Sequence, residues 1–185
     1  MNDKGADGGN GWYDNHLGQW GYFIYAAAVL ANNEPGWWRK WDDRILHIIS
    51  DVAEPSRASE KYPFMREKDW YDGISWSTGL EELDDGKMQK SVSEAVNGWY
   101  SIYLYGLATG NDRVRDIGRL ALGTELRSGI TYTQMPASGG IYPAPFSDNK
   151  IVGTLWSTKV FIRHLKTVSK TKLYTIDELQ LSTYL

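Results

Sequence analysis

Cysteine is absent from this sequence of 185 residues. Its absence excludes disulfide frameworks, thiol nucleophiles and zinc sites built from cysteine. Long hydrophobic runs are missing as well, since the apolar stretch at residues 22–31 is too short to span a bilayer. We therefore expect no membrane partner. The polar, glycine-rich residues 1–11 also lack the apolar centre of a signal peptide.

Excess positive charge is also lacking. The chain has 20 Lys and Arg residues against 23 Asp and Glu residues, and its net charge is −3. A nucleic-acid binder needs a basic stripe to meet the phosphates, so we expect no nucleic-acid partner. Hydrophobic residues make up 42% and charged residues 23%, which is typical of a folded globular protein with a real core.

Motifs for metals, phosphates and activated serines are not found either. The three histidines, His16, His47 and His164, lack the spacing of metal ligands. The glycines of residues 8–11 follow no strand and lack the Lys-Ser/Thr ending of a phosphate loop. No serine lies in a nucleophile-elbow pattern. We therefore expect no metal and no cofactor.

Aromatic residues, by contrast, are abundant. Nine Trp and twelve Tyr supply rings that combine an apolar face with a polar group. Sugar rings have apolar faces edged by hydroxyls, so such residues suit a carbohydrate groove. The ordinary alternative is that these large rings fill a hydrophobic core.

Apolar spacing predicts a mainly α fold. Helices are expected at residues 16–32, 38–52, 88–108 and 112–131. In this pattern Phe23 lies on the buried face of the first helix and Leu107 on that of the third. Asp112 is the expected cap of the fourth helix, and Gly110 ends the third. Short connections within each pair predict antiparallel helical hairpins.

The remaining segments are predicted to be mostly loops. Residues 55–87 form a long loop with one helical turn around Trp76, and residues 136–150 form a Gly/Pro loop. Residues 151–160 are predicted to be a strand or hairpin arm. The last segment, residues 166–185, has only weak periodicity.

Paired carboxylates are the chemistry to look for, because glycoside hydrolysis needs one acid and one base or nucleophile. Candidates are Asp14, the Asp69 and Asp72 pair, and Glu94. Glu94 would share a helix face with Lys90, four residues earlier. The ordinary alternatives are that Asp14 caps a helix and that Glu94 is a first-turn glutamate favoured by the helix dipole. The acidic cluster of residues 81–85 is predicted to be a solvated loop.

Several stretches together resemble glycoside hydrolase family 81, in the family's order and at about its spacing. They are WGYFIYAAAVL at 20–30, DWYDGISWSTGL at 69–80, DGKMQ at 85–89, SEAVN at 93–97, YGLATGN at 105–111 and VGTLWSTKV at 152–160. This resemblance implies part of an (α/α)6 barrel whose groove binds β-1,3-glucan. It also implies an endo-β-1,3-glucanase that inverts configuration without a cofactor.

The sequence departs from the family at polar positions. Asn15 stands where the family has its proposed acid, an Asp, and Gln19 stands where it has a His. Lys90 replaces the first of two glutamates four residues apart, while Glu94 keeps the second. Ile74 replaces a further His. An amide cannot donate a proton as a carboxylic acid does. We therefore expect a diverged or truncated domain with weak or no activity.

The resemblance implies roles for named residues. Glu94 is the expected base, and Asp14 is the expected stand-in for the acid. The expected sugar contacts are Tyr13, Asn15, His16, Gln19, Asp69, Trp70, Tyr71, Trp76 and Lys90.

We divide the chain into a flexible lead-in at 1–11, a partial barrel at 12–165 and a diverged tail at 166–185. Two alternatives remain open, namely a non-catalytic glucan-binding remnant and an inactive gene fragment that needs a partner to complete the barrel. Helix faces left uncovered by a partial barrel would favour self-association. Proteins of the family are often secreted or associated with cell walls.

Overall fold

The fold is mainly helical. A computed structural model describes residues 3–136 and 138–158. Its elements in chain order are α1 (Ala6–Gly9), η1 (Asn10–Trp12), α2 (His16–Asn33), α3 (Pro35–Ala53), β1 (Met88–Gln89), α4 (Val92–Thr109), α5 (Asp112–Tyr132), η2 (Phe146–Asn149) and β2 (Leu155–Trp156). The prediction of a mainly α fold is confirmed.

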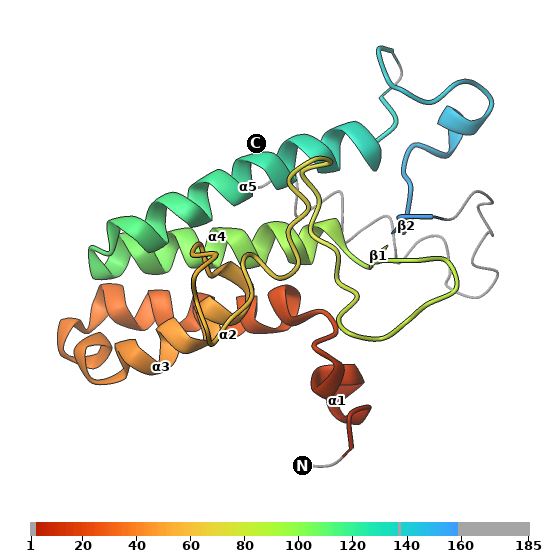
Figure 1. The fold of residues 1–185 in the computed structure, drawn as a ribbon. Helices are drawn as coiled ribbons and strands as arrows, with labels where there is room; N and C mark the ends of the chain where they lie inside the picture. Colours follow the sequence, from red (N-terminus) through yellow and green to blue (C-terminus); the bar gives the residue numbers. More distant parts are fainter. Residues whose placement is uncertain (1–2, 137, 159–185) are drawn as a thin grey trace.

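The four long helices form two hairpins that lie side by side (Figure 1). α2 packs against both α3 and α4, and α4 packs against α5. The order across the layer is therefore α3, α2, α4, α5. Two adjacent antiparallel hairpins fit part of an (α/α)6 barrel.

Caps set the helix boundaries. The side chain of Ser91 accepts the backbone N–H of Glu94 and begins α4, and Gly110 ends it with a φ of 70°. Asn111, not the expected Asp112, caps α5 by accepting the N–H of Val114. The predicted start of the third helix at residue 88 is wrong, because Met88–Gln89 pairs as a strand with β2.

The core lies mainly between α2, α3, α4 and α5. Trp99, Ile102 and Tyr105 of α4 are fully buried at its centre. Leu107, predicted to be buried, is 48% exposed, and Phe23 is 62% exposed. The error has a geometric reason. Trp99, Tyr103 and Leu107 follow one another in steps of four residues, each of which drifts about 40° around the helix, so Leu107 leaves the interface. Phe23 lies about 100° around its helix from the adjacent buried Ile24.

Glycines bring α2 and α4 into close contact. A Cβ on Gly21 would lie 2.8 Å from the Cα of Gly98, so the backbones meet where neither has a side chain. This crossing lies near the beginning of both helices. It therefore brings the residues at their N-terminal ends close together.

The long segment between α3 and β1 runs across the helices without a helix of its own (Figure 1). The predicted loop is confirmed, but the helical turn around Trp76 is wrong. Ser75 forms an isolated antiparallel bridge with Lys68, and the N–H of Trp76 donates to the carbonyl of Glu67 at 2.8 Å. These pairings hold the backbone extended at Trp76.

The C-terminal part of the described chain is irregular. Residues 138–150 form the predicted loop with η2 inside it. Within the predicted strand at 151–160, Ile151 bridges to Gln134 and Leu155–Trp156 forms β2. The predicted domain boundary at 165 and the predicted tail at 166–185 lie outside the described residues. No helix in the described part of the chain has the length and apolarity to cross a membrane.

Candidate functional site

The N-terminal ends of α2 and α4 meet at a polar cluster. Asn15 immediately precedes α2, and Glu94 lies in the first turn of α4. The Asn15 side-chain amide donates to Oε2 of Glu94 at 3.0 Å. The hydroxyl of Tyr22 donates to Oε1 of Glu94 at 3.3 Å. The structure thus brings the predicted turn and the predicted base into direct contact.

Asp14 and Lys90 form a second pair in the same cluster. The Lys90 ammonium donates to Oδ2 of Asp14, whose residue is 9% exposed. Lys90 precedes α4, so it does not share a helix face with Glu94 as expected. Its ammonium pairs with Asp14 and not with Glu94. Gln19 lies near Asp14, and its amide is 3.5 Å from the Asp14 carbonyl.

A short backbone segment holds both halves of the cluster in place. Asn15 has a φ of 54°, a left-handed conformation that Asn tolerates better than most residues. Its N–H donates to the carbonyl of Ser77 at 2.6 Å. The Ser77 hydroxyl in turn accepts the N–H of Lys90 at 2.9 Å. Ser77 therefore links the turn before α2 to the strand that leads into α4.

The contact between Asn15 and Glu94 limits what chemistry the pair can do. Inverting hydrolysis needs its two carboxyl groups about 6.5–9.5 Å apart, so that a water fits between base and sugar. A donor–acceptor distance of 3.0 Å leaves no room for a water between Asn15 and Glu94. Both oxygens of Glu94 already accept hydrogen bonds from protein groups.

His16 lies beside the cluster but points into the protein. It is 5% exposed, its Nδ1 lies 2.5 Å from Oδ2 of Asp51, and its Nε2 lies 3.0 Å from the carbonyl of Asn10. Both ring nitrogens therefore have protein partners. The half-buried ring of Tyr13 packs between two neighbours. Its centroid lies 5.1 Å from that of the tilted His16 ring and 4.1 Å from the guanidinium carbon of Arg66.

Asp51 connects α3 to the residues around His16. It accepts the indole N–H of Trp20 at 3.1 Å and a guanidinium N–H of Arg66 at 2.8 Å. Burial alone would raise the pKa of Asp51. The hydrogen bond with His16 and the charge of Arg66 outweigh that effect, so the pKa lies below its usual value.

Asp69 shapes a separate aromatic turn. Its Oδ1 accepts the N–H groups of Tyr71 and Asp72, and its Oδ2 accepts the indole N–H of Trp76 at 3.1 Å. Burial raises the pKa of Asp69, but these hydrogen bonds reverse the shift and lower it. Trp76 is buried, whereas Trp70 is 40% and Tyr71 is 96% exposed. The turn therefore presents two rings to solvent.

These aromatic residues are not joined to the polar cluster. Among the described residues, no hydrogen bond, ion pair or ring contact connects Trp70 or Tyr71 to Asp14, Asn15 or Glu94. Of the predicted site residues, Asp14, Asn15, Gln19, Lys90 and Glu94 thus form one cluster. Tyr13 and His16 lie behind it, and Asp69, Trp70, Tyr71 and Trp76 form the turn.

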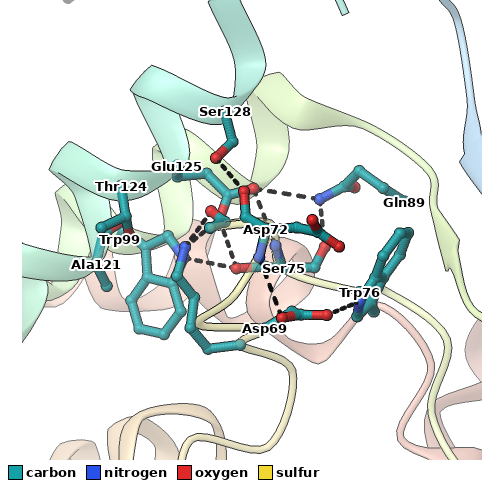
Figure 2. Close-up of polar contacts among 12 residues, drawn as sticks. Asp69, Asp72, Ser75, Trp76, Gln89, Trp99, Ala121, Thr124, Glu125 and Ser128 are labelled. Carbon is teal, nitrogen blue, oxygen red and sulfur yellow. Dashed lines mark hydrogen bonds and ion pairs between the residues drawn. The ribbon is translucent and has the colours of Figure 1, made fainter. Parts of the chain in front are cut away.

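A buried ion pair was missed by the sequence interpretation. Lys68 Nζ lies 2.8 Å from Oε2 of Glu125, and both side chains are almost fully buried. Ser75 donates its hydroxyl to the same oxygen at 2.6 Å and its N–H to Oε1 at 3.1 Å. Figure 2 shows Ser75 and Gln89 directed at Glu125, with the indole N–H of Trp99 donating to Ser75. Burial lowers the pKa of Lys68 even though Glu125 opposes the shift.

This network ties the aromatic turn to the helices. Lys68 also donates to the carbonyl of Gly73 at 2.6 Å, and the hydroxyl of Ser128 donates to the carbonyl of Asp72 at 2.6 Å. The signal in the sequence was a charged Glu125 in phase with the buried positions of its helix. Its cation, Lys68, lies 57 residues away and could not be paired with it from local spacing.

Glu67 is a second missed residue. It is 4% exposed, and its Oε1 accepts the N–H of Leu17 at 3.2 Å. Burial raises the pKa of Glu67 to about 8, although backbone hydrogen bonds from Leu17 and His16 act in the opposite direction. No three His, Asp or Glu side chains gather as a metal site in the part of the chain that the structure describes.

Comparisons with known proteins agree with this fold. The family model described as the glycosyl hydrolase family 81 C-terminal domain matches residues 1–177. A glucan endo-1,3-beta-D-glucosidase of Glycine max is 35% identical over 159 residues, which cover 85% of this chain and 24% of that protein. One from Acetivibrio thermocellus is 39% identical over 121 residues, which cover 64% of this chain and 16% of that protein.

A solved structure is similar as well. A mutant of the glycoside hydrolase family 81 enzyme from Clostridium thermocellum superposes with a TM-score of 0.81 at 30% sequence identity. The match covers 92% of this chain and 24% of that one. The chain thus spans less than a quarter of the length of the relatives it matches.

Proposed function

Because the chain belongs to glycoside hydrolase family 81, we propose that it is an endo-β-1,3-glucanase-type domain that binds β-1,3-glucan and hydrolyses it weakly or not at all. The glucan specificity follows from the relatives, which are named glucan endo-1,3-beta-D-glucosidases. The weak turnover follows from the site. The proposal of weak turnover rests on one observation, the 3.0 Å hydrogen bond from the Asn15 amide to the Glu94 carboxylate.

Glu94 is the residue we assign to the base. In inverting hydrolysis the base activates a water while an acid protonates the leaving oxygen. For Glu94 to do so, the Asn15 amide must move away and a water must take its place. Asp14 is the acid that the resemblance offers in place of Asn15, but its ion pair with Lys90 places it poorly for proton donation. The proposed pair is therefore incomplete on its acid side.

Glucan contacts are proposed for the predicted residues around the cluster and on the aromatic turn. Trp70 and Tyr71 offer exposed faces on which sugar rings can stack. Gln19, Asn15 and Lys90 offer hydrogen-bond donors for sugar hydroxyls. Tyr13, His16, Asp69 and Trp76 are more enclosed, and their proposed role is to shape the groove behind these contacts.

The test is laminarin hydrolysis measured beside laminarin binding, on the chain and on Glu94→Gln. We expect binding by both proteins, slow release of reducing sugar from the chain, and none from Glu94→Gln. Absence of binding in both would contradict the glucan assignment. Binding without turnover that Glu94→Gln leaves unchanged would favour the second candidate, a non-catalytic glucan-binding remnant.

Self-association is a further proposal, supported by the outer face of α2. Tyr22, Phe23, Tyr25 and Val29 of this helix are 43–62% exposed. Apolar patches of this kind favour association, either between copies or with a partner that completes the barrel.

A further inference from the structure

The first turn of every helix has backbone N–H groups that need acceptors. The side chain of the N-cap residue usually supplies one, and Asn is among the preferred residues there. Asn15 is the N-cap of α2, yet its side chain makes no capping hydrogen bond. Its amide reaches Glu94 instead. Some other group must therefore satisfy the N-terminus of α2.

Glu67 is that group. Its carboxyl accepts the N–H of Leu17, the second residue of α2, and also hydrogen-bonds to the backbone of His16. Leu17 is one of the positions that an N-cap side chain would itself serve. Glu67 comes from a loop 50 residues away and is buried beneath the helix end.

At α4, too, a residue from outside the helix accepts a hydrogen bond that a helix residue would normally accept. Ser91 and Glu94 have the spacing of a capping box, in which the glutamate returns to accept the N–H of the serine. Ser91 does accept the N–H of Glu94 at 3.3 Å. The N–H of Ser91, however, donates to Oε1 of Gln89 at 3.0 Å. Glu94 is therefore available to Asn15 and Tyr22.

Gly18 provides the space in which the Asn15 side chain lies. A Cβ on Gly18 would come within 2.8 Å of Oδ1 and 2.9 Å of Nδ2 of Asn15. Those distances are shorter than any ordinary carbon contact. A side chain at this position would therefore displace the Asn15 amide from its path past the first turn of α2 to Glu94.

We propose that Glu67, Gln89 and Gly18 are positioning residues. Glu67 and Gln89 take over hydrogen bonds at the N-terminal ends of α2 and α4, and Gly18 leaves space for the Asn15 side chain. Asn15 and Glu94 are therefore free to bond to each other in the site. The position of the contact follows from geometry alone. That the contact belongs to a glucan site rests on the proposed function.

The surroundings of Glu67 support this role. Burial and the charge of Asp51 raise its pKa, the backbone hydrogen bonds and Arg66 oppose the rise, and the net pKa is about 8. His16, Asp51 and Arg66 are the titratable and charged groups around it. A protonated carboxyl keeps a carbonyl oxygen that can accept an N–H, and so does the amide of Gln.

The decisive variant is Gly18→Ala, with Gly123→Ala as its matched control. Both glycines lie inside helices, but a Cβ on Gly123 would meet nothing within 4 Å. The measurement is hydrogen exchange of the Asn15 side-chain amide by NMR on the full chain. We expect exchange to become about tenfold faster in Gly18→Ala and to stay unchanged in Gly123→Ala. Unchanged exchange in a folded Gly18→Ala would overturn the proposal.

Two variants at Glu67 give an independent test. Glu67→Gln keeps an acceptor for Leu17, and the Asn15 amide should exchange as in the unmodified chain. Glu67→Leu removes the acceptor, and the Asn15 amide should lose its protection as it turns back to cap α2. Equal protection in both would contradict the proposal. Laminarin binding measured on the same samples tests the proposed function separately, because the exchange rates do not depend on glucan.

Discussion

Asn15 decides the chemistry of the site at the scale of single residues. Its amide donates a hydrogen bond that holds the carboxylate of Glu94, but it cannot transfer a proton to a leaving oxygen. Lys90 meanwhile binds the carboxylate of Asp14. Relative to the family pattern, Asn15 and Lys90 therefore give a polar surface with fixed hydrogen bonds in place of an acid–base pair. These contacts support the proposed function, a site that binds sugar hydroxyls better than it breaks glycosidic bonds.

Glu67 should make stability depend on pH. Its pKa rises from 4.5 in the unfolded chain to about 8 in the fold, so the folded state binds the proton more tightly. This contribution to the free energy of unfolding is complete below pH 4.5 and is lost as pH rises through about 8. Between pH 5 and pH 9 the unmodified chain should lose roughly 3–5 kcal/mol of unfolding free energy through Glu67. Glu67→Gln should not show this loss. Urea unfolding followed by tryptophan fluorescence at both pH values measures it.

The control is Glu81→Gln, a change in an exposed loop residue. It should keep the pH dependence of the unmodified chain. If Glu67→Gln loses stability between pH 5 and pH 9 as steeply as the unmodified chain, another group carries the dependence.

The residue pairs of the cluster differ in how far sequence could predict them. The resemblance assigned Glu94 and Asp14 to one site, as its expected base and acid. The capping of the two helix starts by Glu67 and Gln89, in place of Asn15 and Glu94, could not be predicted. Asn15 and Glu94 both match the local preferences of a helix start, and only tertiary contacts with Glu67 and Gln89 turn them elsewhere.

At the scale of elements, the helices were predictable because their signals are local. Apolar spacing located all four long helices within a few residues. β1 was missed because it exists only by pairing with β2, more than 60 residues along the chain. The extended backbone at Trp76 was missed for the same reason, since it depends on hydrogen bonds with Glu67 and a bridge at Ser75.

The Lys68–Glu125 pair should hold the aromatic turn on α5. Lys68→Met would leave Glu125 buried without its cation, which costs about 3–5 kcal/mol of unfolding free energy. Urea unfolding at pH 7 measures the loss. The double variant Lys68→Met, Glu125→Gln removes both charges and should recover at least part of it. A double variant less stable than Lys68→Met would contradict a charge-based role for the pair.

At the scale of the whole molecule, the outer face of α2 is the feature with most consequence. The chain spans under a quarter of its relatives' length, and Phe23 and Val29 are 62% and 45% exposed. We predict concentration-dependent association in sedimentation velocity. Phe23→Ser with Val29→Ser should reduce it, while Leu120→Ser, at an equally exposed position on α5, should not. A monodisperse monomer that melts cooperatively would argue against self-association.

The most direct measurement is reducing-sugar release from laminarin by the chain and by the double variant Asn15→Asp, Lys90→Glu. These changes place a carboxylic acid at position 15, remove the amide that donates to Glu94, and remove the cation bound to Asp14. We predict little release by the unmodified chain and a gain of at least about tenfold in the double variant, below the roughly hundredfold or more that general acid catalysis usually contributes. Efficient release by the unmodified chain, abolished by Glu94→Gln, would contradict it.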